Sequence, residues 1–426
     1  MTERDVEIME KLKSAMPYYY GASKESSNNI RFVIEMQDEI DGEMFAKAVK
    51  LSMSRYPYFC VRVASNDQEL FLEENKEDVV VAHTNEPITL GGMDANGHLL
   101  AFSWWGNQVY LDCFHGLSDG AGYLPLINTV IYYYCRERYD SNLNPEGIRL
   151  GGESIPEEEI KDLYPDSVDD SIKPVGRYVR KSAFDLRSAG LCTPGNPFWY
   201  EVQIPEDAFM KYNRSNDASP AVMIGVLMAR AVEELHKNAD KPIVCSMAMN
   251  IRKTLHAMTA HHSLVTQLFL EYKEAMKKMD IGEQATCFRG MIMIQGQDEN
   301  IWQSVKGNLK INERIHAMPD MKSKRMMTQQ IVESCVGLDT FKVSYVGKNH
   351  MGAAEKYVKG MHVVLDMNRN NMMIEVSAVH GWFHLTFQQN WAEDVYVKAF
   401  LRQLDKEGIT YKTKEGQTIK VASIDF

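Results

Sequence analysis

The interpretation of this chain starts from one stretch, Phe114-His115-Gly116-Leu117-Ser118-Asp119-Gly120. Residues 107–114 alternate apolar and polar side chains, which predicts a strand, and residues 120–138 form a long apolar run that predicts a helix. The heptapeptide therefore lies where a strand ends and a helix begins. A histidine at that point can hold its ring at the mouth of a cleft. Its ordinary pKa of about 6.5 leaves a neutral imidazole that can accept a proton at physiological pH.

The heptapeptide also carries an acidic residue and two glycines. Asp119 stands at the start of the predicted helix, where a carboxylate can pair with an arginine and hold the turn. Gly116 and Gly120 permit a tight bend and close backbone packing. For the heptapeptide alone, a structural turn around a satisfied histidine is the simpler explanation.

Further segments change that interpretation because they match one family in order. The run from His115 to Gly120 resembles the HxxxDG signature of the CoA-dependent acyltransferase superfamily, which includes chloramphenicol acetyltransferase, alcohol O-acetyltransferases, plant BAHD acyltransferases and nonribosomal condensation domains. Three other segments are similar to motifs of the same proteins, and the matches follow the family's order between residues 30 and 404. These segments are Ser54-Arg55-Tyr56-Pro57 with Phe59 and Arg62, Ser246-Met247-Ala248-Met249-Asn250-Ile251-Arg252-Lys253, and Val343-Ser344-Tyr345-Val346-Gly347.

The resemblance implies an α/β (α+β) fold of two chloramphenicol-acetyltransferase-like sandwich domains with an active-site tunnel between them. His115 would be the catalytic general base in that tunnel. It would take the proton of an acceptor hydroxyl or amine during attack on a thioester carbonyl. It would then return the proton to the leaving thiolate, with no covalent enzyme intermediate.

The resemblance also implies roles for residues around the histidine. Asp119 would be structural and directed at an arginine, and the sequence leaves open whether that partner is Arg252 or Arg62. Gly120 would let the following helix pack closely. Two further candidates for the tunnel wall are Ser344 and Tyr345.

Two departures narrow the resemblance. Condensation domains usually carry two adjacent histidines, and here Phe114 stands in place of the first. The DFGWG run of the plant BAHD branch is also absent from the sequence. The alcohol O-acetyltransferase-like branch is therefore the nearest. It implies transfer from acyl-CoA, or from a phosphopantetheine thioester on an acyl carrier protein, to a small-molecule acceptor, with no permanently bound cofactor.

Two other functions remain open at this stage. The residues Gly116-Leu117-Ser118-Asp119-Gly120 also satisfy the GxSxG nucleophile elbow of α/β-hydrolases, which would make Ser118 the nucleophile and His380 or His384 its base. An HGGG-like oxyanion loop and regular strand–helix alternation are both missing from the sequence, which argues against a hydrolase. The second possibility is a non-catalytic condensation-like binding domain, and the intact HxxxDG motif favours an enzyme.

Histidine pairs raise the question of a metal site. His380 and His384 form an HxxxH pair, and His261 and His262 are adjacent. Such a pair is convincing on a helix, whereas His380 precedes a glycine in what looks like a hairpin corner, so no metal site is expected. The sequence also lacks GxxxxGK[ST] and GxGxxG runs, which argues against nucleoside triphosphate and dinucleotide binding.

Length and composition predict two domains. A chain of 426 residues, 45% of them hydrophobic, exceeds one ordinary core. Residues 141–174 are rich in acidic residues, glycine and proline, which predicts a solvated linker. The expected domains are residues 1–172, which carry the HxxxDG motif, and residues 173–426. The net charge of -11 argues against nonspecific binding to nucleic acid or to an anionic membrane surface.

Cysteine usage and hydropathy predict a cytoplasmic protein. The seven cysteines include no CxxC pair and are expected to be reduced thiols. Residues 1–16 interleave charged with apolar residues and lack the apolar core of a signal peptide. No run reaches the ~18–20 apolar residues that a membrane span needs.

Periodicity predicts further elements on both sides of the linker. Each half should mix strands and helices around a sheet. The predicted strands are residues 29–36, 59–63, 198–204, 243–249, 264–272, 361–366, 373–379 and 383–388, and the predicted helices are residues 42–56, 219–236, 299–316 and 393–404.

Overall fold

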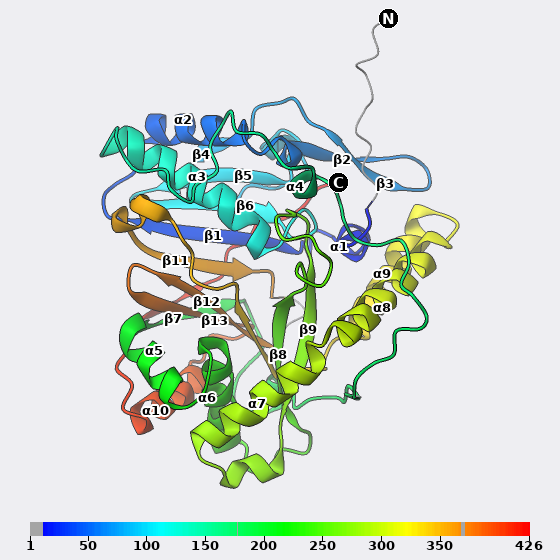
Figure 1. Ribbon diagram of the computed structural model, residues 1–426, viewed down its shortest axis with the longest axis vertical. Coiled ribbons are helices and arrows are strands. Elements are labelled where there is room, and N and C mark those ends of the chain that lie inside the picture. Colours follow the sequence, from blue (N-terminus) through cyan, green and yellow to red (C-terminus); the bar gives the residue numbers. More distant parts are fainter. Residues whose placement is uncertain (1–11, 177, 368–370) are drawn as a thin grey trace, which may run out of the picture.

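The computed structural model describes residues 12–176, 178–367 and 371–426. The prediction about a signal peptide in residues 1–16 therefore falls mainly on residues outside this description. Figure 1 shows a mixed α/β molecule in which two large sheets lie one above the other, each with helices packed on it. This is the sheet-based α/β architecture that the sequence predicts.

The upper sheet in Figure 1 consists of β1 (Asn29–Met36), β4 (Val81–His83), β5 (Leu100–Trp105), β6 (Gln108–Phe114) and β11 (Val358–Leu365), with α2 (Gly42–Met53) and α3 (Gly120–Arg138) packed on it. Its strand order is β11-β1-β6-β5-β4. Because side chains alternate along a strand, Ile30, Phe32 and Ile34 of β1 all face buried surroundings. Together with α2 and α3 they form the first hydrophobic core.

The lower sheet consists of β7 (Phe198–Pro205), β8 (Ile243–Asn250), β9 (Val265–Tyr272), β10 (Phe341–Tyr345), β12 (Met372–Val379), β13 (Trp382–Gln389) and β14 (Lys412–Thr418), and its helices are α5 (Glu206–Ser215), α6 (Pro220–Leu235), α7 (Ile281–Gln295) and α10 (Val395–Lys406). The strand order is β14-β7-β13-β12-β10-β8-β9. β10 runs parallel to both of its neighbours, and the other pairs are antiparallel. This mixed sheet differs from the largely parallel sheet that an α/β-hydrolase requires.

The two halves of the chain exchange segments. β11 comes from the C-terminal half but pairs with β1 in the upper sheet, where Ile30 lies opposite Leu365. The last residues also return to the upper half, where Ile424 bridges to Leu90. The sheets therefore cross the boundary predicted after residue 172, and the division of the chain into residues 1–172 and 173–426 stays a prediction.

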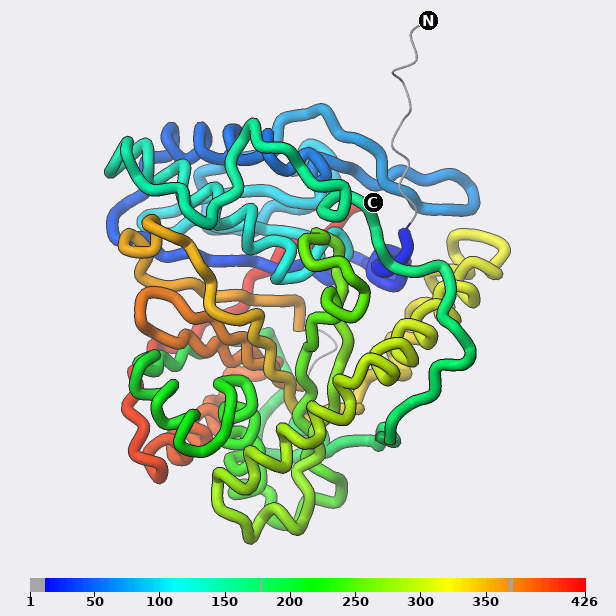
Figure 2. The backbone as a smooth tube through the Cα atoms, viewed as in Figure 1, coloured from blue at the N-terminus to red at the C-terminus, as the bar shows by residue number. Residues whose placement is uncertain are grey.

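The acidic segment over residues 141–174 is more than a solvated linker, which corrects the sequence interpretation. Its short helix α4 (Glu157–Ile160) buries Glu159 to 1% exposure. The Glu159 carboxylate accepts hydrogen bonds from Nη1 and Nη2 of Arg55 at 2.8 and 3.0 Å, and Nη1 of Arg149 lies 3.1 Å away. Its backbone carbonyl accepts a hydrogen bond from the backbone N–H of His261 in the second half. Beyond α4, the chain runs down the outer edge of the molecule to the lower sheet (Figure 2).

The remaining elements are α1 (Met16–Gly21), β2 (Val61–Ser65), β3 (Leu70–Glu74), α8 (Asp298–His316) and α9 (Met321–Glu333). α8 and α9 slant across one side of the molecule, and α9 packs against α1 (Figure 1). The predicted strands and helices are confirmed with shifts of a few residues at their ends. The strand predicted over residues 59–63 begins two residues later, because a short 3-10 turn at Pro57–Phe59 delays its start.

None of the helices in the described part of the chain is both long enough and apolar enough to cross a membrane. The seven cysteines are free thiols, as the sequence predicts.

Candidate active site

The predicted turn between strand and helix has several internal anchors. β6 ends at Phe114, and the Phe114 carbonyl accepts a hydrogen bond of 2.8 Å from the hydroxyl of Tyr123 on α3. The backbone N–H of His115 donates to the Asn28 carbonyl at 3.0 Å. Asn28 has φ 56°, a left-handed conformation that asparagine adopts more readily than most residues. His115 is thus placed by β6, by α3 and by the turn before β1.

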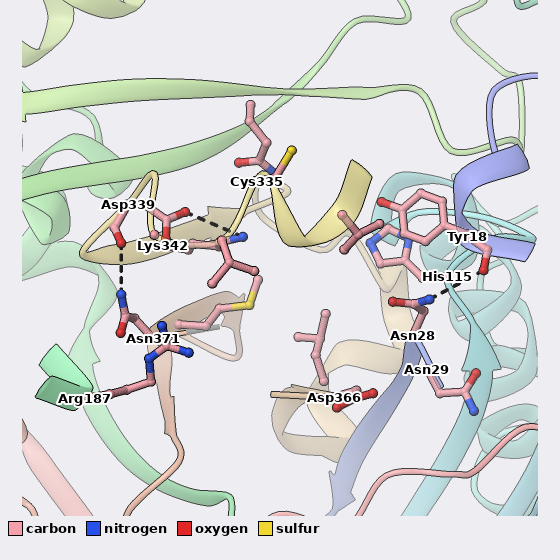
Figure 3. Close-up of a pocket in the computed structure, with 16 residues that line it drawn as sticks. Tyr18, Asn28, Asn29, His115, Arg187, Cys335, Asp339, Lys342, Asp366 and Asn371 are labelled. Carbon is pink, nitrogen blue, oxygen red and sulfur yellow. Dashed lines mark hydrogen bonds and ion pairs between the residues drawn. The ribbon is translucent and has the colours of Figure 1, made fainter. Parts of the chain in front are cut away.

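Two adjoining cavities meet at His115. The first has a volume of about 240 Å³ and the second about 170 Å³. In Figure 3, His115 and Tyr18 stand at one end of the first cavity, and Asp339, Lys342 and Asn371 stand at the other. The residues common to both walls are Tyr18, His115, Gln267, Leu365 and Met373. A histidine at such a junction can face ligands that enter from either side.

The ring of His115 is partly buried and stacks against an aromatic neighbour. The Tyr18 ring stacks on it with centroids 4.9 Å apart and an interplanar angle of 21°. Burial lowers the pKa of His115 below its ordinary value, against a smaller upward effect of nearby backbone carbonyls and of the Asp119 carboxylate. The imidazole is therefore neutral at pH 7. Its Nδ1 atom is buried within the protein.

Asp119 lies at the N-terminus of α3, and both of its carboxylate oxygens accept hydrogen bonds. Its Oδ1 accepts from the backbone N–H of Gly122 at 3.0 Å, and its Oδ2 accepts from the backbone N–H of Leu264 at 2.9 Å. Arg252 donates to both oxygens, with Nη2 2.8 Å from Oδ1 and Nη1 2.9 Å from Oδ2. Asp119 and Arg252 are only 2% and 3% exposed. The pair ties the start of α3 to the end of β8 in the second half.

Arg62, the other arginine that the sequence offered for Asp119, lies elsewhere. It is on β2, and its side chain is 55% exposed and pairs with Glu73 on β3. The structure therefore brings Arg252, and not Arg62, to Asp119.

Ser118 does not face either cavity. It is fully buried, and its hydroxyl donates to the backbone carbonyl of His261. Gly122 permits this contact, because a Cβ atom there would collide with the Ser118 hydroxyl and the His261 carbonyl. A nucleophile elbow exposes its serine on a strained turn, and Ser118 has neither exposure nor a positive φ. The close approach predicted for Gly120 also occurs there, but against Val346 of the second half.

Ser344 and Tyr345 both line the second cavity, together with Asp119 and Gly120. Ser344 lies on β10 beside Glu375 of β12. The Tyr345 ring makes an edge contact with Phe383, with centroids 5.9 Å apart. Tyr345 therefore contributes both to the cavity wall and to core packing.

Sequence reasoning missed several residues of the cavity walls. Tyr18 comes from α1, which no periodicity signalled, and Gln267 comes from the middle of β9. The most informative omission is Glu375, which interrupts the otherwise apolar or small side chains of β12. A single acidic residue within an apolar strand is the signal that could have identified it.

Glu375 is a buried carboxyl group in the wall of the second cavity. It is 7% exposed, and burial raises its pKa to about 8, with a smaller downward effect from a hydrogen bond with Ser344. The group is therefore mostly protonated at pH 7 when the cavity is empty. Its neighbours Ile374 and Val376 point the other way, into the core of the lower half.

Among the residues that the structure describes, one cluster could hold a metal ion, and it contains only one of the histidines considered from the sequence. Ligand atoms of Glu201, His362 and His384 lie within 4.8 Å of one another. Two imidazoles and a carboxylate suit Zn²⁺, but Lys414 already lies 2.9 Å from the Glu201 carboxylate and balances its charge. His380 is absent from the cluster and instead bonds through its backbone N–H to the side chain of Glu355.

In comparisons with known proteins, this chain matches solved structures but no family model and no curated sequence. TRI101 of F. sporotrichioides, in complex with coenzyme A and T-2, has a TM-score of 0.59 at 12% identity, over 96% of this chain and 100% of that one. TRI3 trichothecene 15-O-acetyltransferase of Fusarium sporotrichioides has a TM-score of 0.60 at 12% identity, over 93% of each chain.

A third match extends this likeness beyond the acetyltransferases. The starter condensation domain of rhizomide synthetase RzmA, in complex with C8-CoA and Leu-SNAC, has a TM-score of 0.58 at 12% identity, over 93% of each chain. The chain shares the fold of these two acetyltransferases and of this condensation domain. The two-domain fold expected from the HxxxDG motif is thereby confirmed. The roles of individual residues rest on the local geometry described above.

Proposed function

We propose that this protein is an acyltransferase that moves an acyl group from a thioester to a hydroxyl or amine acceptor, with His115 as the general base. The observation that carries the proposal is the position of His115 at the junction of two cavities. Donor and acceptor must reach one base from different directions, and two adjoining cavities suit that requirement. The coenzyme A bound to TRI101 supports acyl-CoA as the donor.

The proton transfers follow from the state of the imidazole. Because burial lowers the pKa of His115, the ring is neutral at pH 7 and can accept a proton. Because Nδ1 is buried, Nε2 is the ring nitrogen that accepts the proton from the substrate. Nε2 takes the acceptor proton as the acceptor oxygen or nitrogen attacks the thioester carbonyl. It then returns that proton to the departing thiolate sulfur, and no bond forms between acyl group and protein.

The residues around His115 position its imidazole and take no part in the proton transfers. Tyr18 stacks on the His115 ring, and the Asn28 carbonyl fixes its backbone. The Asp119–Arg252 pair acts as a positioning pair, because it holds the start of α3 against the second half. Accurate placement of this kind is a large part of enzymatic rate enhancement.

The finer type of acyltransferase is also a proposal. The nearest branch by motif is the alcohol O-acetyltransferase-like one, and TRI3 is an acetyltransferase acting on oxygen by its name. A phosphopantetheine thioester on an acyl carrier protein is the alternative donor, because it presents the same chemical arm as coenzyme A. The condensation domain among the structural relatives supports this alternative.

The experiment is a measurement of thiol release from acyl-CoA, with and without an alcohol acceptor. We expect acceptor-dependent release from the parent protein. His115→Ala should lose at least ~10²-fold of that rate through loss of the general base. Ser118→Ala should retain most of it, because Ser118 lies outside both cavities.

His83→Ala is a suitable control, because His83 is an exposed histidine on β4 that lies outside both cavity walls. Two results would refute the proposal in different ways. Loss of activity in Ser118→Ala but not in His115→Ala, with a burst of product from an activated ester, would indicate a hydrolase. A parent protein that binds acyl-CoA but releases no thiol with any acceptor would indicate a binding domain.

A further inference from the structure

The second cavity contains an acidic group that His115 catalysis does not use. Glu375 lies on β12, is more than nine-tenths buried and lines this cavity together with His115. The facing walls are apolar and include Ile30, Phe32 and Val363. The cavity therefore combines a hydrocarbon-like surface with two carboxyl groups, of which Asp119 is paired with Arg252 and Glu375 is not.

Nothing in the described part of the chain supplies a positive charge to Glu375. Ser344 is its hydrogen-bond partner. Lys342 is the nearest cation along the same face of β10, and its Nζ atom lies 3.6 Å from Asp339 instead. The guanidinium of Arg252, after the end of β8, donates its hydrogen bonds to Asp119 and to backbone carbonyls instead. A buried carboxyl group without a cation is costly to ionise, which is a feature of binding sites more than of stable cores.

We propose that the second cavity binds an acceptor that carries a protonated amino group, and that Glu375 is the counter-ion for this group. This inference rests on the proposed acyltransferase function, because it assigns the chemical class of the acceptor. The ammonium group supplies the missing charge. The apolar wall holds the hydrocarbon part, so amino alcohols and aliphatic polyamines are the expected class of ligand.

Binding of such a ligand is linked to a proton. In the empty cavity Glu375 has a pKa of about 8, and an adjacent ammonium group lowers that pKa. Amine binding below pH 8 therefore releases a proton, whereas binding of a neutral alcohol does not. The other titratable side chains that line this cavity are Tyr18, His115, Asp119 and Tyr345. Lys342 and His362 lie on its strands β10 and β11 and pair with Asp339 and Glu201 instead.

The test compares two ligands of equal shape, aminohexanol and heptanol, by isothermal titration calorimetry in buffers of different ionisation enthalpy. We expect the parent protein to bind aminohexanol more tightly and with release of about one proton at pH 7. Its affinity for aminohexanol should rise by roughly tenfold per pH unit up to about pH 8. Glu375→Gln should lose ~10–100-fold in this affinity and all of the proton release, with heptanol binding unchanged.

Glu415→Gln removes an exposed carboxylate of β14 and should behave like the parent protein. Equal binding of the two ligands by the parent, or an amine preference that survives in Glu375→Gln, would overturn the inference. Turnover separates this result from failure of the proposed function. Transfer to heptanol without any preference for aminohexanol contradicts only the inference, whereas amine binding without thiol release from acyl-CoA contradicts only the proposed function.

Discussion

Asp119 and Glu375 are both buried carboxyl groups in the wall of the same cavity, but they differ in their hydrogen-bond and charge partners. Asp119 receives two hydrogen bonds from Arg252 and one each from the backbone N–H groups of Gly122 and Leu264. Glu375 has a hydrogen bond with the side chain of Ser344, and burial raises its pKa to about 8. A buried carboxylate whose oxygens are both bonded within the protein supports the structure, whereas one without a cation is available to a ligand.

The difference follows from where each residue stands in the chain. Asp119 is at the N-terminus of α3, where a backbone N–H is free to donate, and Arg252 reaches it from a strand end 133 positions later. Glu375 is in the middle of β12, whose backbone groups already bond to β10 and β13. Backbone donors of its own sheet are therefore unavailable to it.

The largest expected effect is from Asp119→Asn. Asparagine can still cap α3, but it leaves the buried guanidinium of Arg252 without its counter-charge. Breaking a buried pair in this way should lower the free energy of unfolding by ~3–5 kcal/mol, measured by urea denaturation. The double variant Asp119→Asn with Arg252→Gln should lose much less than the sum of the two single variants.

The matched control is Asp41→Asn on α2. Asp41 also caps a helix, accepting from the N–H of Met44 at 3.0 Å, but its nearest arginine, Arg138, is 3.8 Å away and partly exposed. This change should therefore cost less than ~1 kcal/mol. An unchanged urea midpoint for Asp119→Asn, together with lost turnover, would mean that Asp119 takes part in the chemistry.

A smaller effect of opposite sign is expected from Glu375→Gln. The folded protein holds the Glu375 proton up to about pH 8, while the unfolded chain releases it near its ordinary pKa of about 4.3. The parent therefore loses stability relative to the variant as pH rises through this window, and the difference levels off above pH 8. The variant should be more stable at pH 9 by a few kcal/mol at most, and equal or less stable at pH 4.

Urea denaturation of the parent and Glu375→Gln at several pH values between 4 and 9 checks this sign. A difference in unfolding free energy that is constant with pH would show that Glu375 is ionised in the folded protein. In that case the contrast with Asp119 would be lost.

The smallest effect is expected at Arg62. Its pair with Glu73 lies on the surface of the β2–β3 hairpin, with 55% of the Arg62 side chain exposed. Arg62→Ala should change the free energy of unfolding by less than ~1 kcal/mol. A loss as large as that of Arg252→Ala, by thermal or urea unfolding, would contradict the assignment of Arg252 as the partner of Asp119.

Local sequence patterns were sufficient for the elements around the site. The strand before His115 and the helix after it were predicted to within one residue of β6 and α3. Ser219 was also expected at the start of a helix, and its hydroxyl does accept from the N–H of Val222 at 3.4 Å. Strand and helix periodicity and helix capping depend on residues a few positions apart, so they can be predicted from the sequence.

Burial of charge was not predictable in the same way. Glu159 belongs to a segment whose acidic composition indicated a solvated linker, yet it lies in a buried pair with Arg55, which is 104 positions away. The two arginines offered for Asp119 were equivalent by motif, and only folding separated the exposed Arg62 from the buried Arg252.

The sequence by itself determined the strand-to-helix turn that carries His115, the order of the elements and, through the HxxxDG motif, the fold class. The tertiary structure alone decided that two cavities meet at His115 and that Arg252 neutralises Asp119. It also decided that Glu375 faces a cavity whose described wall residues include no lysine or arginine. The physical reason is the range of the interactions. Periodicity and capping act within one element, whereas burial and ion pairing depend on which distant segments the packed sheets bring into contact.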